Sequence, residues 1–204
     1  MLEANDHEKR AQIRSEIIAA AAAVFERRGY QAATMQGIAK QAGYGTASLY
    51  TYFTSKEEIF EAMIEELTAK YHEVFRDSPP PELPFLKKVE HLVQGLMQLT
   101  HQYRDAIGVY MSLRPEADIL PGKRGQRPRV AGYLEVMGAM VSWFERTAPR
   151  KVLARSSADD QAKVLAGILR SFTLSMIAEP TGEWSKTPAK VAAFFLYGIA
   201  GAPG

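Results

Sequence analysis

The chain has 204 residues, a formal net charge of +2, 47% hydrophobic and 24% charged residues, and no cysteine. This apolar content excludes a mainly disordered chain, and the lack of cysteine excludes disulfide scaffolds, thiolate zinc sites and cysteine nucleophiles. Because the longest apolar run, Val191 to Ala202, is shorter than the ~20 residues that span a bilayer, and because the N-terminus is polar, we expect a cytoplasmic protein without a membrane anchor.

Helical periodicity dominates the first third of the chain, with no convincing strand pattern. Thr34 is the expected N-cap of the second helix, and Gly29 and Gly43 end the first and second helices. The segment Ser55-Lys56-Glu57-Glu58 is typical of a capping box that opens a long helix. The helices predicted here span, in chain order, Lys9 to Arg28, Met35 to Ala42, Thr46 to Tyr52 and Lys56 to about Arg76.

The rest of the chain is also predicted to be helical. Prolines between Asp77 and Pro84 end the long helix, and a Pro- and Gly-rich loop is expected from Pro115 to Pro128. The further predicted helices span Leu86 to Tyr103, Ala106 to Leu113, Arg129 to Arg146, Asp159 to Ala178 and Thr187 to Ile199. The sequence therefore predicts an all-α fold of about nine helices.

The second and third predicted helices, joined by a glycine-containing turn, form a helix-turn-helix pattern. The second helix of this motif enters the DNA major groove, which is roughly 12 Å wide. Leu49 and Phe53 are spaced to face the core, which leaves small and hydroxyl-bearing side chains facing outward. Hydroxyl groups bind phosphates and bases, and Ala47 allows a close approach to DNA.

The segments from Thr34 to Gly43 and from Ser48 to Glu57 resemble the DNA-binding domain of the TetR family of transcriptional regulators. The match covers roughly Arg14 to Phe60, about a quarter of the chain. The resemblance implies a helix-turn-helix domain in residues 1–56, a linking helix from 56 to about 76, and a ligand-binding and dimerisation domain in residues 57–204. It also implies a homodimer that binds a palindromic double-stranded operator, most often as a repressor that an inducer releases.

The resemblance also implies which side chains contact DNA. It places Tyr50, Tyr52 and Lys56 against phosphates, and the full predicted DNA-binding set is Thr34, Gln36, Thr46, Ala47, Ser48, Tyr50, Thr51, Tyr52 and Lys56. The chain departs from the family pattern at Tyr44-Gly45, where Val-Ser is usual, so Gly45 or Thr46 must cap the recognition helix. That helix carries no Arg or Lys, which leaves Gln36 as the best placed side chain for reading adenine.

The net charge of +2 is unevenly distributed along the chain. Between Lys9 and Lys56 there are seven Lys or Arg residues and two Glu residues, an excess of five positive charges. Such a local excess attracts phosphates and predicts salt-dependent DNA binding.

The C-terminal part is rich in Met and aromatic residues, which form either an ordinary core or a cavity for a small apolar or aromatic molecule. The predicted pocket residues are Met97, His101, Tyr110, Met111, Met137, Met140, Phe144 and Phe172. The last two predicted helices carry more apolar surface than a monomer core readily buries, so they are the expected dimer interface. The residues expected there are Leu165, Ile168, Leu169, Phe172, Phe194, Phe195 and Ile199.

Other readings of the sequence are weaker. The segment from Gly43 to Ser48 nearly matches the dinucleotide fingerprint but lacks its third glycine and a preceding strand. Catalytic motifs are absent and the four histidines are scattered, so we expect no enzyme activity, no metal and no cofactor. The basic segment 123–129 is a mobile loop, a lid or a second DNA contact. The alternative function is a dimeric small-molecule binding or scaffold protein whose DNA-binding face is disused.

Overall fold

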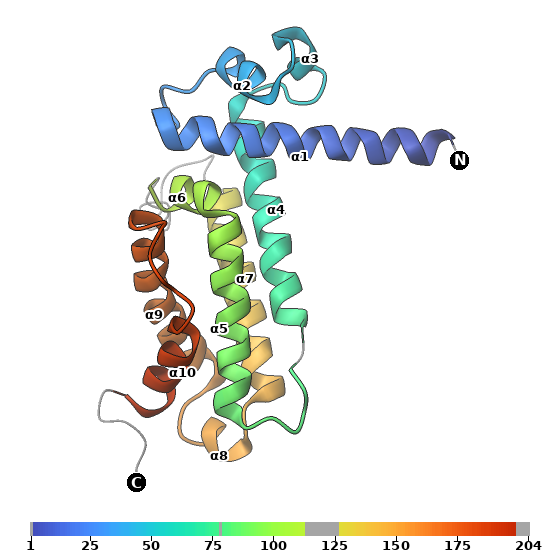
Figure 1. The fold of residues 1–204 in the computed structure, drawn as a ribbon. Helices are drawn as coiled ribbons and strands as arrows, with labels where there is room; N and C mark the ends of the chain where they lie inside the picture. The colour runs from blue at the N-terminus through green and yellow to red at the C-terminus, as the bar shows by residue number, and fades with distance from the viewer. Residues whose placement is uncertain (1, 78, 113–126, 199–204) are drawn as a thin grey trace. The chain divides into compact units, whose positions relative to one another are not determined.

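The computed structural model describes residues 2–77, 79–112 and 127–198, and this part of the chain is all-helical, with ten helices and no strand (Figure 1). The all-α prediction is confirmed, with one helix more than the nine that the sequence predicts. The helices are α1 (Leu2–Arg28), α2 (Met35–Ala42), α3 (Thr46–Tyr50), α4 (Lys56–Arg76), α5 (Phe85–Gln102), α6 (Arg104–Ser112), α7 (Arg127–Thr147), α8 (Arg150–Leu153), α9 (Ala158–Ala178) and α10 (Thr187–Tyr197).

The chain forms two compact units. Unit 1 comprises Met1–Leu67 and Asp105–Val130, and unit 2 comprises Thr68–Arg104 and Ala131–Gly204. Helix α4 contributes to both, whereas the sequence prediction ended the first domain at residue 56. The difference arises because Ile59, Phe60 and Met63, from the first half of α4, belong to the core of unit 1.

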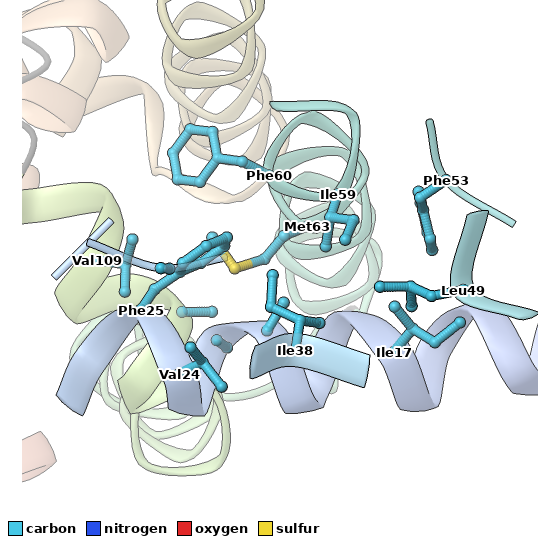
Figure 2. Packing of buried hydrophobic residues seen from close by; sticks show 14 of the residues in the cluster. Ile17, Val24, Phe25, Ile38, Leu49, Phe53, Ile59, Phe60, Met63 and Val109 are labelled. Carbon is cyan, nitrogen blue, oxygen red and sulfur yellow. The ribbon is translucent and has the colours of Figure 1, made fainter. Parts of the chain in front are cut away.

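Unit 1 has a single apolar core made by α1, α2, α3, α6 and the first half of α4 (Figure 2). On α1, residues spaced three and four apart, such as Ile17, Ala21 and Val24, form the buried face. The rings of Phe25 and Phe60 both pack against Tyr30, with centroids 5.1 and 5.3 Å away. The buried side chains labelled in Figure 2 are Ile17, Val24, Phe25, Ile38, Leu49, Phe53, Ile59, Phe60, Met63 and Val109.

Local signals set the ends of α2. The Thr34 hydroxyl oxygen accepts a hydrogen bond from the Gly37 backbone N–H at 3.1 Å, which confirms the predicted N-cap. Gly43 ends the helix with φ of 76°, a left-handed conformation that other residues adopt at a cost.

The predicted capping box at the start of α4 is only half correct. The Ser55 hydroxyl oxygen accepts from the Glu58 backbone N–H at 3.1 Å, as the box requires. The Glu58 carboxylate, however, accepts from the backbone N–H and the hydroxyl of Thr54, at 2.7 and 2.8 Å. The backbone bond first, and then the hydroxyl bond, lower the pKa of Glu58. The return contact is therefore made one residue earlier than predicted.

Unit 2 is built around α5, which packs against α9 and α10 (Figure 1). A Cβ added at Gly95 would lie 3.0 Å from a Val74 methyl carbon, so glycine allows α5 to approach the end of α4 closely. Trp143 and Phe144 of α7 are buried, and the Phe144 ring lies 5.6 Å from that of Phe195. The buried core comprises Phe75, Val89, Leu92, Val93, Leu96, Met97, Met140, Trp143, Phe144, Ala158, Ala162, Leu165, Met176, Val191 and Ala192.

Several predicted boundaries differ from the structure. Helix α1 begins at Leu2 rather than Lys9, because its first residues carry no apolar periodicity from which a start could be predicted. Helix α3 ends at Tyr50, two residues early. Helix α7 begins at Arg127, inside the predicted loop, since proline is tolerated in the first turn of a helix. The sequence did not predict the short α8, and both the remainder of the basic loop and Ile199 lie outside the described residues.

Candidate nucleic-acid interface

Helix α3, the second helix of the helix-turn-helix, turns one face inward and the other to solvent. Leu49 is fully buried and Phe53, just beyond the helix, is 1% exposed, as their spacing predicts. Ala47 and Ser48 are exposed, and Tyr50 keeps 51% of its surface accessible. The outward face is therefore small and hydroxyl-bearing, which suits close approach to base edges and phosphates.

The other predicted contact residues have different surroundings. Gln36 is exposed on the first turn of α2, and Thr46 is half-buried. Thr51 is exposed, but its hydroxyl donates to the Ser48 carbonyl at 2.7 Å, which leaves it free only to accept. Tyr52 is half-buried against the core of unit 1.

The N-terminal end of α3 has no side-chain cap, but the residue before its N-cap makes a hydrogen bond to α1. Gly45 is the N-cap residue, with φ −69° and ψ 146°, and no side chain caps this end of the helix. The adjacent Tyr44 hydroxyl donates to the Glu16 carboxylate at 2.8 Å, and Gln12 donates to the same carboxylate at 3.0 Å. Hydrogen bonds from Gln12 and then Tyr44 lower the pKa of Glu16, and the bond to Glu16 raises the pKa of Tyr44.

The C-terminal side of α3 is tied to α1 by two arginines. Arg10 donates from Nη2 to the Thr51 carbonyl at 3.0 Å, and its guanidinium carbon lies 5.2 Å from the Tyr52 ring centroid. Arg14 donates to the Tyr52 carbonyl and stacks over the Phe53 ring, 4.0 Å from its centroid. Cationic donors at the last carbonyls of a helix satisfy acceptors that have no partner within it.

Lys56, which the resemblance places against a phosphate, is engaged within the protein. Its ammonium group donates to the carbonyls of Tyr30, Gln31 and Ala33, at 3.0, 3.0 and 3.3 Å. The same group lies 4.8 Å from the Tyr30 ring centroid. Because a lysine ammonium has three N–H donors, these carbonyls of the α1–α2 connection account for all of them.

The seven cations between residues 9 and 56 fall into two groups. Arg14 and Lys56 are half-buried, and the other five, Lys9, Arg10, Arg27, Arg28 and Lys40, are exposed. From the sequence, Arg10 and Arg14 are identified only as positive charges of this segment. Arg14 could have been singled out, because it lies three residues before Ile17, next to the apolar stripe of α1, where a charged side chain needs a buried partner.

The predicted pocket residues are divided between the two units. Met97, Met140 and Phe144 lie in the core of unit 2, and Met137 and Phe172 pack against it. Tyr110 packs against the core of unit 1, Met111 is half-buried on α6, and His101 is exposed. A separate groove of about 370 Å³ in unit 2, between the end of α4 and α5, is lined by other residues, including Lys70, Asp77, His91, Gln98 and Tyr103.

The predicted dimer residues also differ in exposure. Leu165 is fully buried within its own unit, so it has no surface left for a partner. Ile168, Leu169, Phe172 and Phe195 are half-buried, and Phe194 is 48% exposed. Three further large apolar side chains are exposed on α9 and α10, namely Val164, Leu174 and Tyr197.

Among the helices of residues 2–77, 79–112 and 127–198, none has the length and apolar character of a membrane span. Within the same ranges, His, Asp and Glu side chains nowhere gather in a group of three or more that could hold a metal ion.

Residues 17–63 match the family described as bacterial regulatory proteins, tetR family. The chain is 33% identical over 88 residues to the uncharacterized HTH-type transcriptional regulator YhgD of Bacillus subtilis, a match that covers 42% of this chain and 46% of that protein. The chain therefore spans less than half the length of YhgD.

Two further similarities extend over most of the chain. The HTH-type transcriptional regulator UidR of Escherichia coli is 24% identical over 172 residues, covering 83% of this chain and 82% of UidR. A solved structure from Clostridium perfringens, of a protein whose proposed role is regulation of fatty acid metabolism, has a TM-score of 0.73 at 25% identity. The similarity covers 90% of this chain and 98% of the Clostridium perfringens chain.

Proposed function

Because the chain belongs to the TetR family of transcriptional regulators, we propose that it is a dimeric repressor of transcription. It binds a palindromic operator through α2 and α3 and leaves the operator when a small apolar or aromatic inducer binds. The observation that carries this proposal is the outward face of α3, where Ala47, Ser48 and Tyr50 are exposed on a helix that Leu49 holds against the core.

DNA recognition in this proposal relies on polar side chains and on shape. The exposed Tyr50 hydroxyl contacts a phosphate, while Ala47 and Ser48 approach the base edges. Gln36, exposed at the start of α2, is the side chain suited to a bidentate contact with adenine. The exposed cations of unit 1 add a sequence-independent attraction to phosphates, so the affinity should fall steeply with salt.

Dimerisation in this proposal uses one face of α9 together with α10. Exposed residues of α9 recur at spacings of three and four, at Val164, Gly167, Ser171, Leu174 and Ala178. A stripe of apolar and small residues at this spacing lets a second helix pack closely. A twofold dimer brings two copies of α3 onto half-sites about one DNA turn apart, roughly 34–36 Å.

The inducer in this proposal binds within unit 2. Met97 and Met140 are adaptable side chains in a core that also holds Phe144, which suits an apolar ligand. The buried indole N–H of Trp143 has no hydrogen-bond partner among the described residues, so an oxygen atom of the inducer would satisfy it. An apolar inducer also agrees with the fatty acid role proposed for the similar Clostridium perfringens protein. Mass spectrometry of compounds that co-purify with the protein tests this assignment.

Footprinting tests DNA binding directly, with duplexes from the DNA that flanks the gene for this chain. We expect protection of a palindromic site at low salt, and a loss of protection in Tyr50→Ala with the dimer intact. Tyr133→Ala is the matched control, because Tyr133 is a similarly exposed tyrosine (46%) on α7 of unit 2. A folded dimer that protects no DNA at low salt would refute the repressor and favour the small-molecule binding or scaffold protein.

A further inference from the structure

We propose that Arg14 and Lys56 are positioning residues, which direct their charges to backbone carbonyls before α2 and after α3 rather than to DNA phosphates. This inference rests on the proposed function, because it concerns how the DNA-binding surface is held in shape. Both residues lie within the segment that carries the excess positive charge, and both are half-buried, unlike the other five cations. Arg10 also donates to a backbone carbonyl, that of Thr51, but it is exposed, as are the other four cations, so burial sets Arg14 and Lys56 apart.

Lys56 links the start of α4 to the connection between α1 and α2. Its three donors are all taken by carbonyls of that connection, which lie 23 to 26 residues earlier in the chain. The connection leads directly into Thr34, the N-cap of α2. Removing the ammonium group would leave three carbonyls without this donor and loosen the entry to α2. A phosphate contact by the same group would require it to release some of these bonds.

Arg14 links α1 to the end of the recognition helix. Its guanidinium donates to the Tyr52 carbonyl and covers the Phe53 ring. The contact matters because α3 has only five residues and no side-chain N-cap. Isolated helices shorter than about 12 residues are marginal in water, so the position of α3 depends on contacts with neighbouring elements.

Salt dependence separates a positioning role from a phosphate contact. Log affinity falls as log salt rises, and each phosphate contact that is lost makes this negative slope less steep by about 0.9 for duplex DNA. A positioning residue lowers the affinity at every salt concentration and leaves the slope unchanged. The binding measurement therefore uses Arg14→Met and Lys56→Met, which keep most of the side-chain stem, on a duplex from the DNA flanking the gene.

We expect each variant to bind roughly tenfold more weakly or worse, since hydrogen bonds from charged groups are among the stronger ones, with the wild-type salt slope. Lys40→Met is the control for both variants. Lys40 is an exposed residue of α2, and its ammonium group has no side-chain partner in the described ranges. Lys56→Arg keeps the charge but replaces the compact ammonium by a planar fork, so it should also bind more weakly. A reduced slope in either Met variant, or wild-type affinity in Lys56→Arg, overturns the proposal.

Hydrogen exchange on the DNA-free protein gives a second measurement that does not depend on DNA binding. In Lys56→Met the backbone amides of Gly37 and Ile38, which both donate to Thr34, should exchange faster, and in Arg14→Met those of residues 49–53 should do so. Lys40→Met should leave both segments unchanged. Wild-type exchange rates in both Met variants would overturn the positioning role, whereas a wild-type protein that binds no duplex would refute only the proposed function.

Discussion

Replacing Gly45 by serine should stabilise the recognition helix, because it supplies the side-chain cap that α3 lacks. Gly45 has φ −69° and ψ 146°, which any residue adopts, and an added Cβ meets only the Ser48 hydroxyl, at 3.8 Å. Both serine and alanine therefore fit. A serine oxygen can accept from the free N–H groups in the first turn, and at an N-cap serine is more stable than alanine by about 1 kcal/mol and than glycine by a few tenths.

The expected order of unfolding free energy is Gly45→Ser, then wild type, then Gly45→Ala. Urea denaturation should separate the two variants by roughly 0.3–1 M in midpoint with equal m-values. Hydrogen exchange of the α3 amides reports the same difference locally, as about a fivefold change in protection. If Gly45→Ala is as stable as Gly45→Ser, the gain comes from a less flexible unfolded chain rather than from the cap, and the argument is refuted.

Three further changes test other parts of the structure. Phe53→Ala should lower the unfolding free energy by about 3–5 kcal/mol in urea denaturation, whereas exposed Tyr50→Ala should change it by less than ~0.5 kcal/mol; equal losses would contradict the orientation of α3. Because the Thr54 N–H lowers the pKa of Glu58, their contact stabilises the fold above the ordinary glutamate pKa and is lost as the pH falls through the lowered value. The stability difference between wild type and Glu58→Gln should therefore shrink in acid, and a difference that does not vary with pH would exclude this contact. Leu174→Glu puts a charge on the exposed face of α9 and should give a monomer in sedimentation experiments; an unchanged dimer would exclude this face as the interface.

Features that depend on neighbouring residues could be predicted from the sequence. Helix α2 was predicted with both its ends, because Thr34 and Gly43 mark them through local backbone preferences. The inward face of α3 followed from the spacing of Leu49 and Phe53. The long helices of unit 2 were placed to within a few residues, because their apolar periodicity is strong.

Features that depend on distant backbone groups could not be predicted. The partners of Lys56 are main-chain carbonyls, which no residue type in the sequence reveals. The Glu58 contact moved to Thr54 for the same reason, since the backbone path before α4 decides which N–H is within reach. Helix α8 has four residues and too little periodicity to detect. The pocket was predicted from composition, which could not separate Tyr110, in unit 1, from Met97, in unit 2.

The division of α3 into a buried and an exposed face has an evolutionary consequence. The side chains that would read an operator, at positions 47, 48 and 50, are exposed and contribute little to packing. Substitutions at such positions usually change stability by less than ~0.5 kcal/mol. New operator preferences can therefore arise by point mutation without loss of the fold, while Leu49, Phe53 and the contacts with α1 keep the helix in place. The residues proposed to read the operator can therefore vary independently of the residues that hold the recognition helix in place.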